Sequence, residues 1–243
     1  MARKSHWKRR YFTGTRPGER VLILIVLAIM IGVSLGLLLP QTHERVAQIT
    51  GEYYASGPAS QALDTLRVDD NTNVARYNRT EFGYRSTDDD HNGCDVREDV
   101  LARDLSDVVY KRGTYKVQSG TLNDPYTGKT IYFVRGNKTS ALVQIDHVVA
   151  LENAWISGAN KWSSAKKIQF GNDMHNLLAV DGPANQEKGS ASAAYWLPTN
   201  SAYRCAYVAK QISVKKQYDL SVTTKEYKAM KAVLRSCPTQ QLI

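Results

Sequence analysis

The sequence ALVQIDHVVAL occupies residues 141–151, and it decides how the chain is interpreted. Its first half is a short apolar run, which is typical of a buried strand. From Ala150 to Gly158 the pattern of apolar residues takes a helical period. The sequence therefore predicts a strand that leads directly into two polar residues, Asp146 and His147, and is followed by a helix.

Two short motifs downstream complete the pattern. Asn176 precedes an apolar run, and N-x-x-K-G follows at residues 185–189, where we expect a helix. Each motif alone is weak, because Asp-His pairs are common and an Asn before apolar residues is usually a turn or a cap. In this order, however, the three motifs have the layout of a metal-centred hydrolytic site built from a hairpin and a helix.

These residue types suit the hydrolysis of a phosphodiester, which needs an activated water, a cation and help for the leaving oxygen. Asp146 and Asn185 offer hard oxygen ligands for Mg²⁺ or Mn²⁺, and the amide makes Zn²⁺ a poorer match. His147 belongs to the residue type whose pKa of about 6.5 suits a base at neutral pH. Asn176 can hold the loop that carries His147, and Lys188 can contact phosphate.

The set Asp146-His147, Asn176 and Asn185-x-x-Lys188 resembles the HNH endonuclease motif, also called ββα-metal or His-Me finger. The resemblance covers roughly residues 75–237. It includes the stretches NGCDVR (92–97), SGTLNDPYTG (119–128), AWISGA (154–159), WLP (196–198) and YRCAY (203–207). Together they resemble a family of exported bacterial HNH proteins related to the nuclease domain of modification-dependent restriction enzymes.

The resemblance implies an α+β fold with a ββα-metal core and additional helices. It implies Asp146 and Asn185 as ligands of Mg²⁺ or Mn²⁺, His147 as general base, and Asn176 as the residue that orients the loop carrying His147. It also implies a disulfide between Cys205 and Cys237. Relatives often carry a further Cys shortly before SGTL, which residues 114–117 lack, so we expect Cys94 to be a buried free thiol.

The net charge of +9 is unevenly distributed. Residues 1–40 carry +6, residues 41–160 carry −4, and residues 161–243 carry +7. The first basic region precedes an uncharged apolar run from Val21 to Leu39, which as a helix is roughly 28 Å long, enough to cross a bilayer. The basic flank predicts that residues 1–20 stay in the cytoplasm and that the rest is exported. An uncleaved anchor and a cleaved signal peptide both fit, and no A-x-A site follows the run.

We expect residues 40–75 to form a stalk, with GPAS at 57–60 as a loop, and residues 76–243 to form the endonuclease domain. A helix is predicted from Asp95, the N-cap of a capping box with Glu98, to a stop at Gly113. Strands are predicted within residues 114–145, around a turn at 124–128. Further helices are expected at 163–170, near Asn185, at 199–216 and at 223–236.

Three weaker patterns allow alternative interpretations. Residues 88–99 partly match a calcium-binding loop, although a solvated acidic turn fits better. Cations of the C-terminal third could track phosphate or lie on solvated helix faces: Lys210, Lys215, Lys216, Lys225, Lys228, Lys231 and Arg235. Trp155, Trp162 and Trp196 are expected in the core rather than as platforms for bases.

Two functions from different classes remain. The first is an endonuclease that cuts DNA, with RNA as a second candidate, at the cell surface or after secretion and with little sequence preference. The second is a catalytically silent surface protein that binds nucleic acid or a partner through the same fold. The complete set of Asp146, His147, Asn176 and Asn185 favours the first. The predicted partners are nucleic acid and, through residues 21–39, a membrane; no protein partner is evident.

Overall fold

The computed structural model describes residues 17–42, 56–83, 88, 92–137 and 139–243. They fall into two units, residues 1–54 and 55–243. In the first unit, α1 (Pro17–Thr42) is a helix of 26 residues. Its segment Gly18–Leu37 is long and apolar enough to cross a membrane, as predicted, and its apolar side chains are exposed. Of the basic residues that precede the apolar run from Val21, only Arg20, within α1, is among the described residues.

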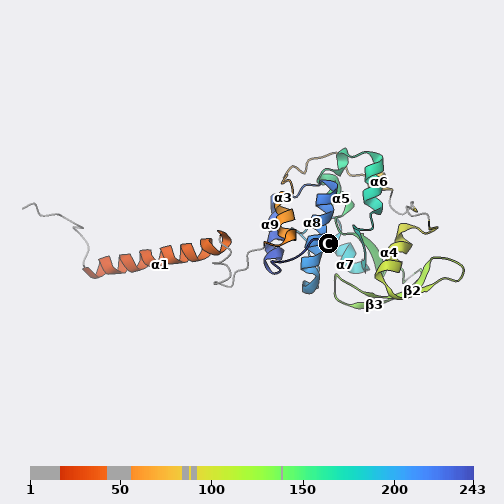
Figure 1. Ribbon diagram of the computed structural model, residues 1–243, viewed down its shortest axis with the longest axis horizontal. Helices are drawn as coiled ribbons and strands as arrows, with labels where there is room; N and C mark the ends of the chain where they lie inside the picture. The colour runs from red at the N-terminus through yellow and green to blue at the C-terminus, as the bar shows by residue number, and fades with distance from the viewer. Residues whose placement is uncertain (1–16, 43–55, 84–87, 89–91, 138) are drawn as a thin grey trace, which may run out of the picture. The chain divides into compact units, whose positions relative to one another are not determined.

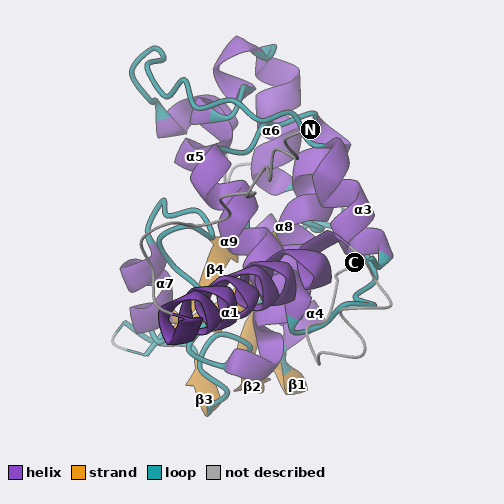
Figure 2. Cartoon of the chain, turned by 90° about the vertical axis from the view of Figure 1, so that its left-hand side faces the viewer, coloured by secondary structure: helices purple, strands orange, loops and turns teal. Residues whose placement is uncertain are grey.

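The second unit is a mixed α+β fold, which confirms the predicted class (Figures 1 and 2). Its helices are α3 (Pro58–Thr65), η1 (Arg79–Phe82), α4 (Val96–Asp104), α5 (Leu151–Ile156), η2 (Ala159–Lys161), α6 (Ser164–Asn172), α7 (Gly182–Lys188), η3 (Ser201–Tyr203), α8 (Arg204–Tyr218) and α9 (Thr224–Arg235). Its strands are β1 (Ser106–Tyr110), β2 (Val117–Asn123), β3 (Thr130–Val134), β4 (Val143–His147) and β5 (Leu177–Asp181).

The strands form two antiparallel sheets. One has the order β1-β2-β3, and the other pairs β4 with β5 in a register that sets His147 opposite Leu177 and Val143 opposite Asp181. Helix α7 follows β5 directly, because Asp181 caps it by accepting from the Ala184 amide and Pro183 suits a first turn. Two strands and a helix thus carry the predicted motif, and the helix lies around Asn185 as expected.

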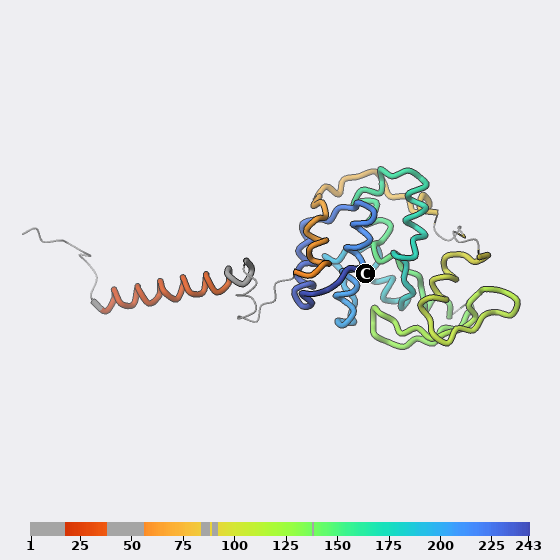
Figure 3. The backbone as a smooth tube through the Cα atoms, in the orientation of Figure 1, coloured from red at the N-terminus to blue at the C-terminus, as the bar shows by residue number. Residues whose placement is uncertain are grey.

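The folded unit begins earlier than expected. Helix α3 lies where the stalk was predicted, and its residues Ala59, Ala62 and Leu63 are buried against α8 and α9. Two backbone hydrogen bonds, from Gly57 to Pro238 and from Ala59 to Gln240, join this start to the end of the chain. Figure 3 shows this orange segment beside the dark blue C-terminal segment. The prediction of a linker over residues 40–75 is therefore wrong for residues 58–65.

The helix after Asp95 is shorter than predicted. Asp95 accepts a hydrogen bond from the Glu98 amide, which confirms the cap, but α4 ends at Asp104. The following residues form β1, whose Val108 and Val109 are β-branched and suit a strand. Gly113, expected to end a helix, lies instead in the turn between β1 and β2 with φ +71°. Pairing with β2 has overridden the local helical pattern.

An aromatic cluster supports the helices beside the site. Phe82, Trp155, Phe170 and Tyr218 are buried together, with ring centroids of Phe170 and Tyr218 4.9 Å apart. Trp162 is partly buried against this cluster, and Trp196 is buried with Tyr126 and Tyr207 in the core around α3, α8 and α9. The prediction that the tryptophans belong to the core is confirmed for Trp155 and Trp196, whereas Trp162 lies at the edge of the core.

Candidate functional site

A polar cavity of about 390 Å³ lies where β4 meets α7. Three of the predicted site residues line it, namely Asp146 and His147 at the end of β4 and Asn185 in α7. They are brought together because β5 pairs antiparallel with β4, and α7 begins directly after the end of β5. Residues of β4 and α7 line this cavity, and β5 connects the two; because α5, η2 and α6 lie between β4 and β5, the strand pair is not the tight hairpin expected from the motif.

Asp146 is a buried carboxylate that accepts hydrogen bonds from one ammonium group and one phenol. Its Oδ1 accepts from Lys188 Nζ at 2.9 Å, and its Oδ2 accepts from the Tyr126 hydroxyl at 2.5 Å. Burial raises the pKa of Asp146, and the Lys188 ammonium and the Tyr126 hydrogen bond oppose that shift. Both donors fix the direction of the carboxylate at the edge of the cavity.

Lys188 does not reach the surface of the cavity, where a contact with phosphate would require its ammonium group to lie. Its side chain is fully buried, and its ammonium donates both to Asp146 and to the backbone oxygen of His147, the latter at 2.9 Å. A buried ammonium beside a carboxylate is held there by the ion pair, since removing it would leave that charge unpaired. The sequence prediction needs correction here: in this structure Lys188 supports Asp146 from inside.

His147 is buried and neutral. Its Nε2 lies 2.8 Å from the carbonyl oxygen of Gly171, and because a carbonyl only accepts, Nε2 carries the proton and Nδ1 the lone pair. Burial, with smaller effects of Arg79 and Lys188, lowers the pKa of His147 to about 3. The imidazole is therefore neutral, but the burial that lowers its pKa also makes it a weaker base than the value near 6.5 expected from the sequence. A Cβ on Gly171 would lie 2.3 Å from the Phe82 carbonyl oxygen. The close approach of these two backbone segments, which places the Gly171 carbonyl beside His147, therefore requires glycine.

Asn176 holds the loop that follows His147. Its Oδ1 accepts from the Val149 amide at 2.8 Å, and its Nδ2 donates to the Val149 carbonyl at 3.1 Å. Its own backbone oxygen accepts from the Val148 amide. Asn176 is fully buried, so these bonds are shielded from water. The side chain thus makes the contacts that an orienting role requires, and it does not line the cavity itself.

Asn185 is oriented by a neighbour from β4. Its Nδ2 donates to Gln144 Oε1 at 3.0 Å, so its amide oxygen is the atom left for a hard cation. Asp146 and Asn185 face one cavity and offer the carboxylate and amide oxygens that Mg²⁺ and Mn²⁺ accept. Among the described residues, no group of three or more His, Cys, Asp or Glu could hold a metal ion. The donors present fit a loosely held hard cation with several waters.

Sequence reasoning missed three contributors to the site. Arg79 lines the cavity from η1, and its charge lowers the pKa of His147. Tyr126 and Gln144 orient Asp146 and Asn185. Arg79 lies in a 3₁₀ turn far upstream of the motif, and no local spacing links it to the site. Tyr126 belongs to a stretch quoted for the resemblance, but its place within the predicted turn at 124–128 gave no hint that it contacts Asp146.

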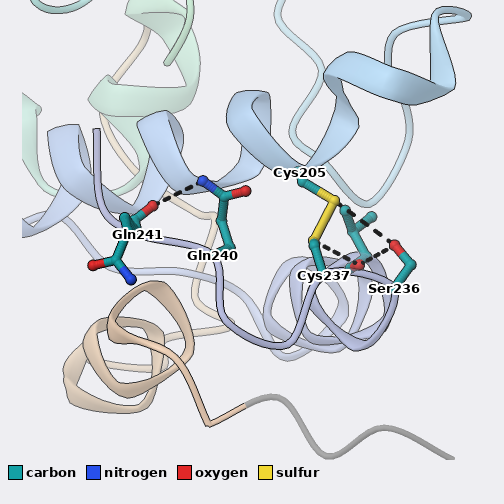
Figure 4. The surroundings of a disulfide bond; sticks show 6 residues. Cys205, Ser236, Cys237, Gln240 and Gln241 are labelled. Atoms are coloured by element: carbon teal, nitrogen blue, oxygen red, sulfur yellow. Dashed lines mark hydrogen bonds between the residues drawn. A yellow bond between two sulfur atoms is a disulfide. The ribbon is translucent and has the colours of Figure 1, made fainter.

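The predicted disulfide joins Cys205 at the start of α8 to Cys237 after α9 (Figure 4). Cys94 is buried and free, as expected. In the suspected calcium loop, the Asp88 carboxylate accepts from the amides of Asn92 and Gly93, and Asn92 donates to Asp99. Residues 89–91 of that loop lie outside the described part, so the choice between a calcium loop and the favoured acidic turn is not tested.

Comparison with known proteins identifies the family. The family described as GmrSD restriction endonucleases, C-terminal domain, matches residues 95–233, more than half of the chain. An uncharacterized secreted protein of Arthroderma benhamiae is 40% identical over 146 residues, which are 59% of this chain and 68% of that protein. This relative is fungal, so the expectation of a bacterial family stays a prediction. No solved structure matches the chain.

Proposed function

Because the chain belongs to the family of GmrSD restriction endonuclease C-terminal domains, we propose that it is a metal-dependent HNH-type endonuclease. It hydrolyses phosphodiester bonds of DNA, with RNA as a second candidate substrate, and has little sequence preference. The observation that carries the proposal is the shared cavity of Asp146, His147 and Asn185, formed by two antiparallel strands and a helix in the order of the ββα-metal motif.

Each residue at the cavity has a proposed role. Asp146 and Asn185 would hold a Mg²⁺ or Mn²⁺ ion, and such an ion would supply positive charge next to the phosphate and its leaving oxygen. His147, neutral and fixed by the Gly171 carbonyl, takes a proton from the attacking water. Asn176 keeps the His147 loop in place, and Arg79 replaces Lys188 as the cation that meets the phosphate.

The proposed place of action is outside the cytoplasm. The apolar helix α1 fits a signal peptide or an anchor, and the similar fungal protein is described as secreted. The disulfide between Cys205 and Cys237 is of the kind that persists in oxidising compartments. We propose that α1 anchors the chain with the catalytic unit outside, and cleavage of the segment would release the same unit.

The test is nicking of supercoiled plasmid by the full chain in detergent micelles, with Mg²⁺, Mn²⁺ or EDTA. We expect cutting that requires metal and falls about 10²- to 10⁴-fold in His147→Ala, the usual contribution of a general base. His175→Ala is the matched control, because His175 is half-buried and does not line the cavity. No cutting with any divalent metal, by a folded wild-type chain, would favour a silent protein that binds nucleic acid through the same fold.

A further inference from the structure

A second cavity, of about 900 Å³, adjoins the first and has no role in the chemistry proposed above. Ser190 lines both, so the two cavities meet just after the C-terminal end of α7. We call the second one the Tyr195 cavity. The lining residues that matter here are Asp70, Ser190, Tyr195, Thr224, Lys225 and Lys228.

Tyr195 is an aromatic ring held out to solvent by a fixed backbone. Its amide and the amide of Trp196 both donate to the Ser192 carbonyl, at 3.0 and 3.1 Å. The Trp196 ring next to it is buried, with its centroid 5.0 Å from that of Tyr126. The Tyr195 side chain is nevertheless 72% exposed. The Tyr195 ring is therefore not held by core packing, whereas Ala193 and Trp196 close to it in the chain are buried.

Two cations stand beside the ring. Lys225 Nζ lies 6.0 Å from the centroid of Tyr195, and Lys228 lines the same cavity one turn further along α9. Both lysines are exposed, and among the described residues neither makes an ion pair with a carboxylate. Asp70 is the acidic residue of the lining, and its two oxygens accept from the backbone amide and the hydroxyl of Thr224. The lining thus carries more positive than negative charge.

We propose that the Tyr195 cavity binds an unpaired nucleotide of a single strand, next to the scissile phosphate. This inference rests on the proposed function. The base stacks on the Tyr195 ring, and the backbone phosphates meet Lys225 and Lys228. An exposed aromatic ring next to exposed cations is how proteins hold single strands without reading their sequence. A duplex hides its base faces, so this site selects unpaired or frayed strands, in DNA or RNA.

Binding is measured apart from cleavage, with the full chain in micelles and EDTA, by fluorescence anisotropy. The probes are a labelled 12-nucleotide oligothymidylate, an abasic strand of the same length, and a 12-base-pair duplex. We expect the oligothymidylate to bind about tenfold more tightly than the abasic strand, because only the former has bases to stack. We expect Tyr195→Ala to remove that difference and Tyr195→Phe to keep it.

The lysine variants separate the phosphate contacts from stacking. Lys225→Gln/Lys228→Gln should weaken the binding of both single strands and lower the slope of log affinity against log salt by roughly one to two. Tyr132→Ala, at an equally exposed tyrosine on β3, and Lys216→Gln, at an exposed lysine on α8, are the matched controls and should change neither probe.

Three results would overturn the inference: equal binding of the oligothymidylate and abasic strands, unchanged binding in Tyr195→Ala, or binding of the duplex as tight as that of the single strand. The result also separates the two proposals. Stacking at Tyr195 in a chain that cuts no plasmid would refute hydrolysis alone. Metal-dependent cutting by the wild-type chain, together with unchanged binding of the oligothymidylate by the Tyr195→Ala variant, would refute this site alone.

Discussion

Two regions of the folded unit bury both partners of a lysine–carboxylate ion pair, and the two pairs have different roles. Lys188 Nζ lies 2.9 Å from Asp146 and Lys215 Nζ lies 3.1 Å from Glu226, and both lysine side chains are fully buried. Lys215 also donates to Ser157 and to the Ser221 carbonyl, which joins α5, α8 and α9 into the core. Asp146, in contrast, borders the cavity that it shares with His147 and Asn185. A buried ion pair therefore does not mark a site by itself; what distinguishes the two is access to a polar cavity.

The largest expected effect is the loss of one partner in either pair. Lys188→Met and Lys215→Met should each lower the free energy of unfolding by about 3–5 kcal/mol, because a carboxylate is left buried and unpaired. Urea unfolding followed by tryptophan fluorescence measures this loss. Cleavage per folded molecule should fall about 10- to 100-fold in Lys188→Met alone, since only that lysine orients a proposed metal ligand. Equal cleavage by the two variants would contradict a specific role of Lys188 at the proposed metal site.

Neutralising both partners should restore stability in each region but activity in only one. In Lys215→Met/Glu226→Gln we expect about 3 kcal/mol to be regained over the single lysine variant, because no unpaired charge stays buried. Lys188→Met/Asp146→Asn should regain a similar amount and still fail to cut DNA. The measurements are the same unfolding curves together with plasmid nicking. Recovery of cutting in the second double variant would remove Asp146 from the proposed metal site.

The pH dependence of stability should also differ between the regions. The pKa of His147 is lowered to about 3 by burial, so below about 6.5 the unfolded chain takes up a proton that the folded chain refuses. Stability is therefore lost as the pH falls through this window. Between pH 7 and 5, in EDTA, we expect the free energy of unfolding of the wild-type chain to fall about 2 kcal/mol more than that of His147→Gln. Parallel pH profiles would contradict the burial of a neutral His147.

The smallest effect concerns the phenol that touches Asp146. Tyr126→Phe removes one hydrogen bond to a buried carboxylate and should cost about 1.5 kcal/mol. It should also weaken Mn²⁺ binding, measured by calorimetry, by several-fold, because Asp146 loses one of its two positioning contacts. Tyr207→Phe is the control: Tyr207 is equally buried, and its hydroxyl accepts from Gln211 instead. Loss of Mn²⁺ affinity in both variants would reduce Tyr126 to a general packing role.

The parts of the fold that local chemistry determines were predictable from the sequence. The Asp95 cap, the turn at 124–128 and the strands leading to Asp146 follow from residue types at fixed spacing. The contacts of Asn176 with Val149 match the role that the resemblance implied. Within the site, Asp146, His147 and Asn185 were expected together, and they line one cavity.

The features that were missed depend on distant partners. Residues 58–65 look like linker until the C-terminal helices supply a surface for Ala59 and Leu63. The helical pattern after Asp104 gives way because β2 offers a partner strand. Lys188 resembles any exposed cation until Asp146 and the His147 carbonyl surround it. Arg79 reaches the cavity through the packing of η1 on α6, which no spacing in the sequence records.

The joining of the two ends of the folded unit has a consequence for biosynthesis. Helix α3, at the start of the unit, packs on α8 and α9, and residues 57–59 pair with residues 238–240. The first element therefore has no partner until the ribosome has made α8, α9 and residues 238–240. Such long-range contacts form late and slowly. A chain synthesised only as far as α7 therefore contains the motif residues but lacks the helices on which α3 packs.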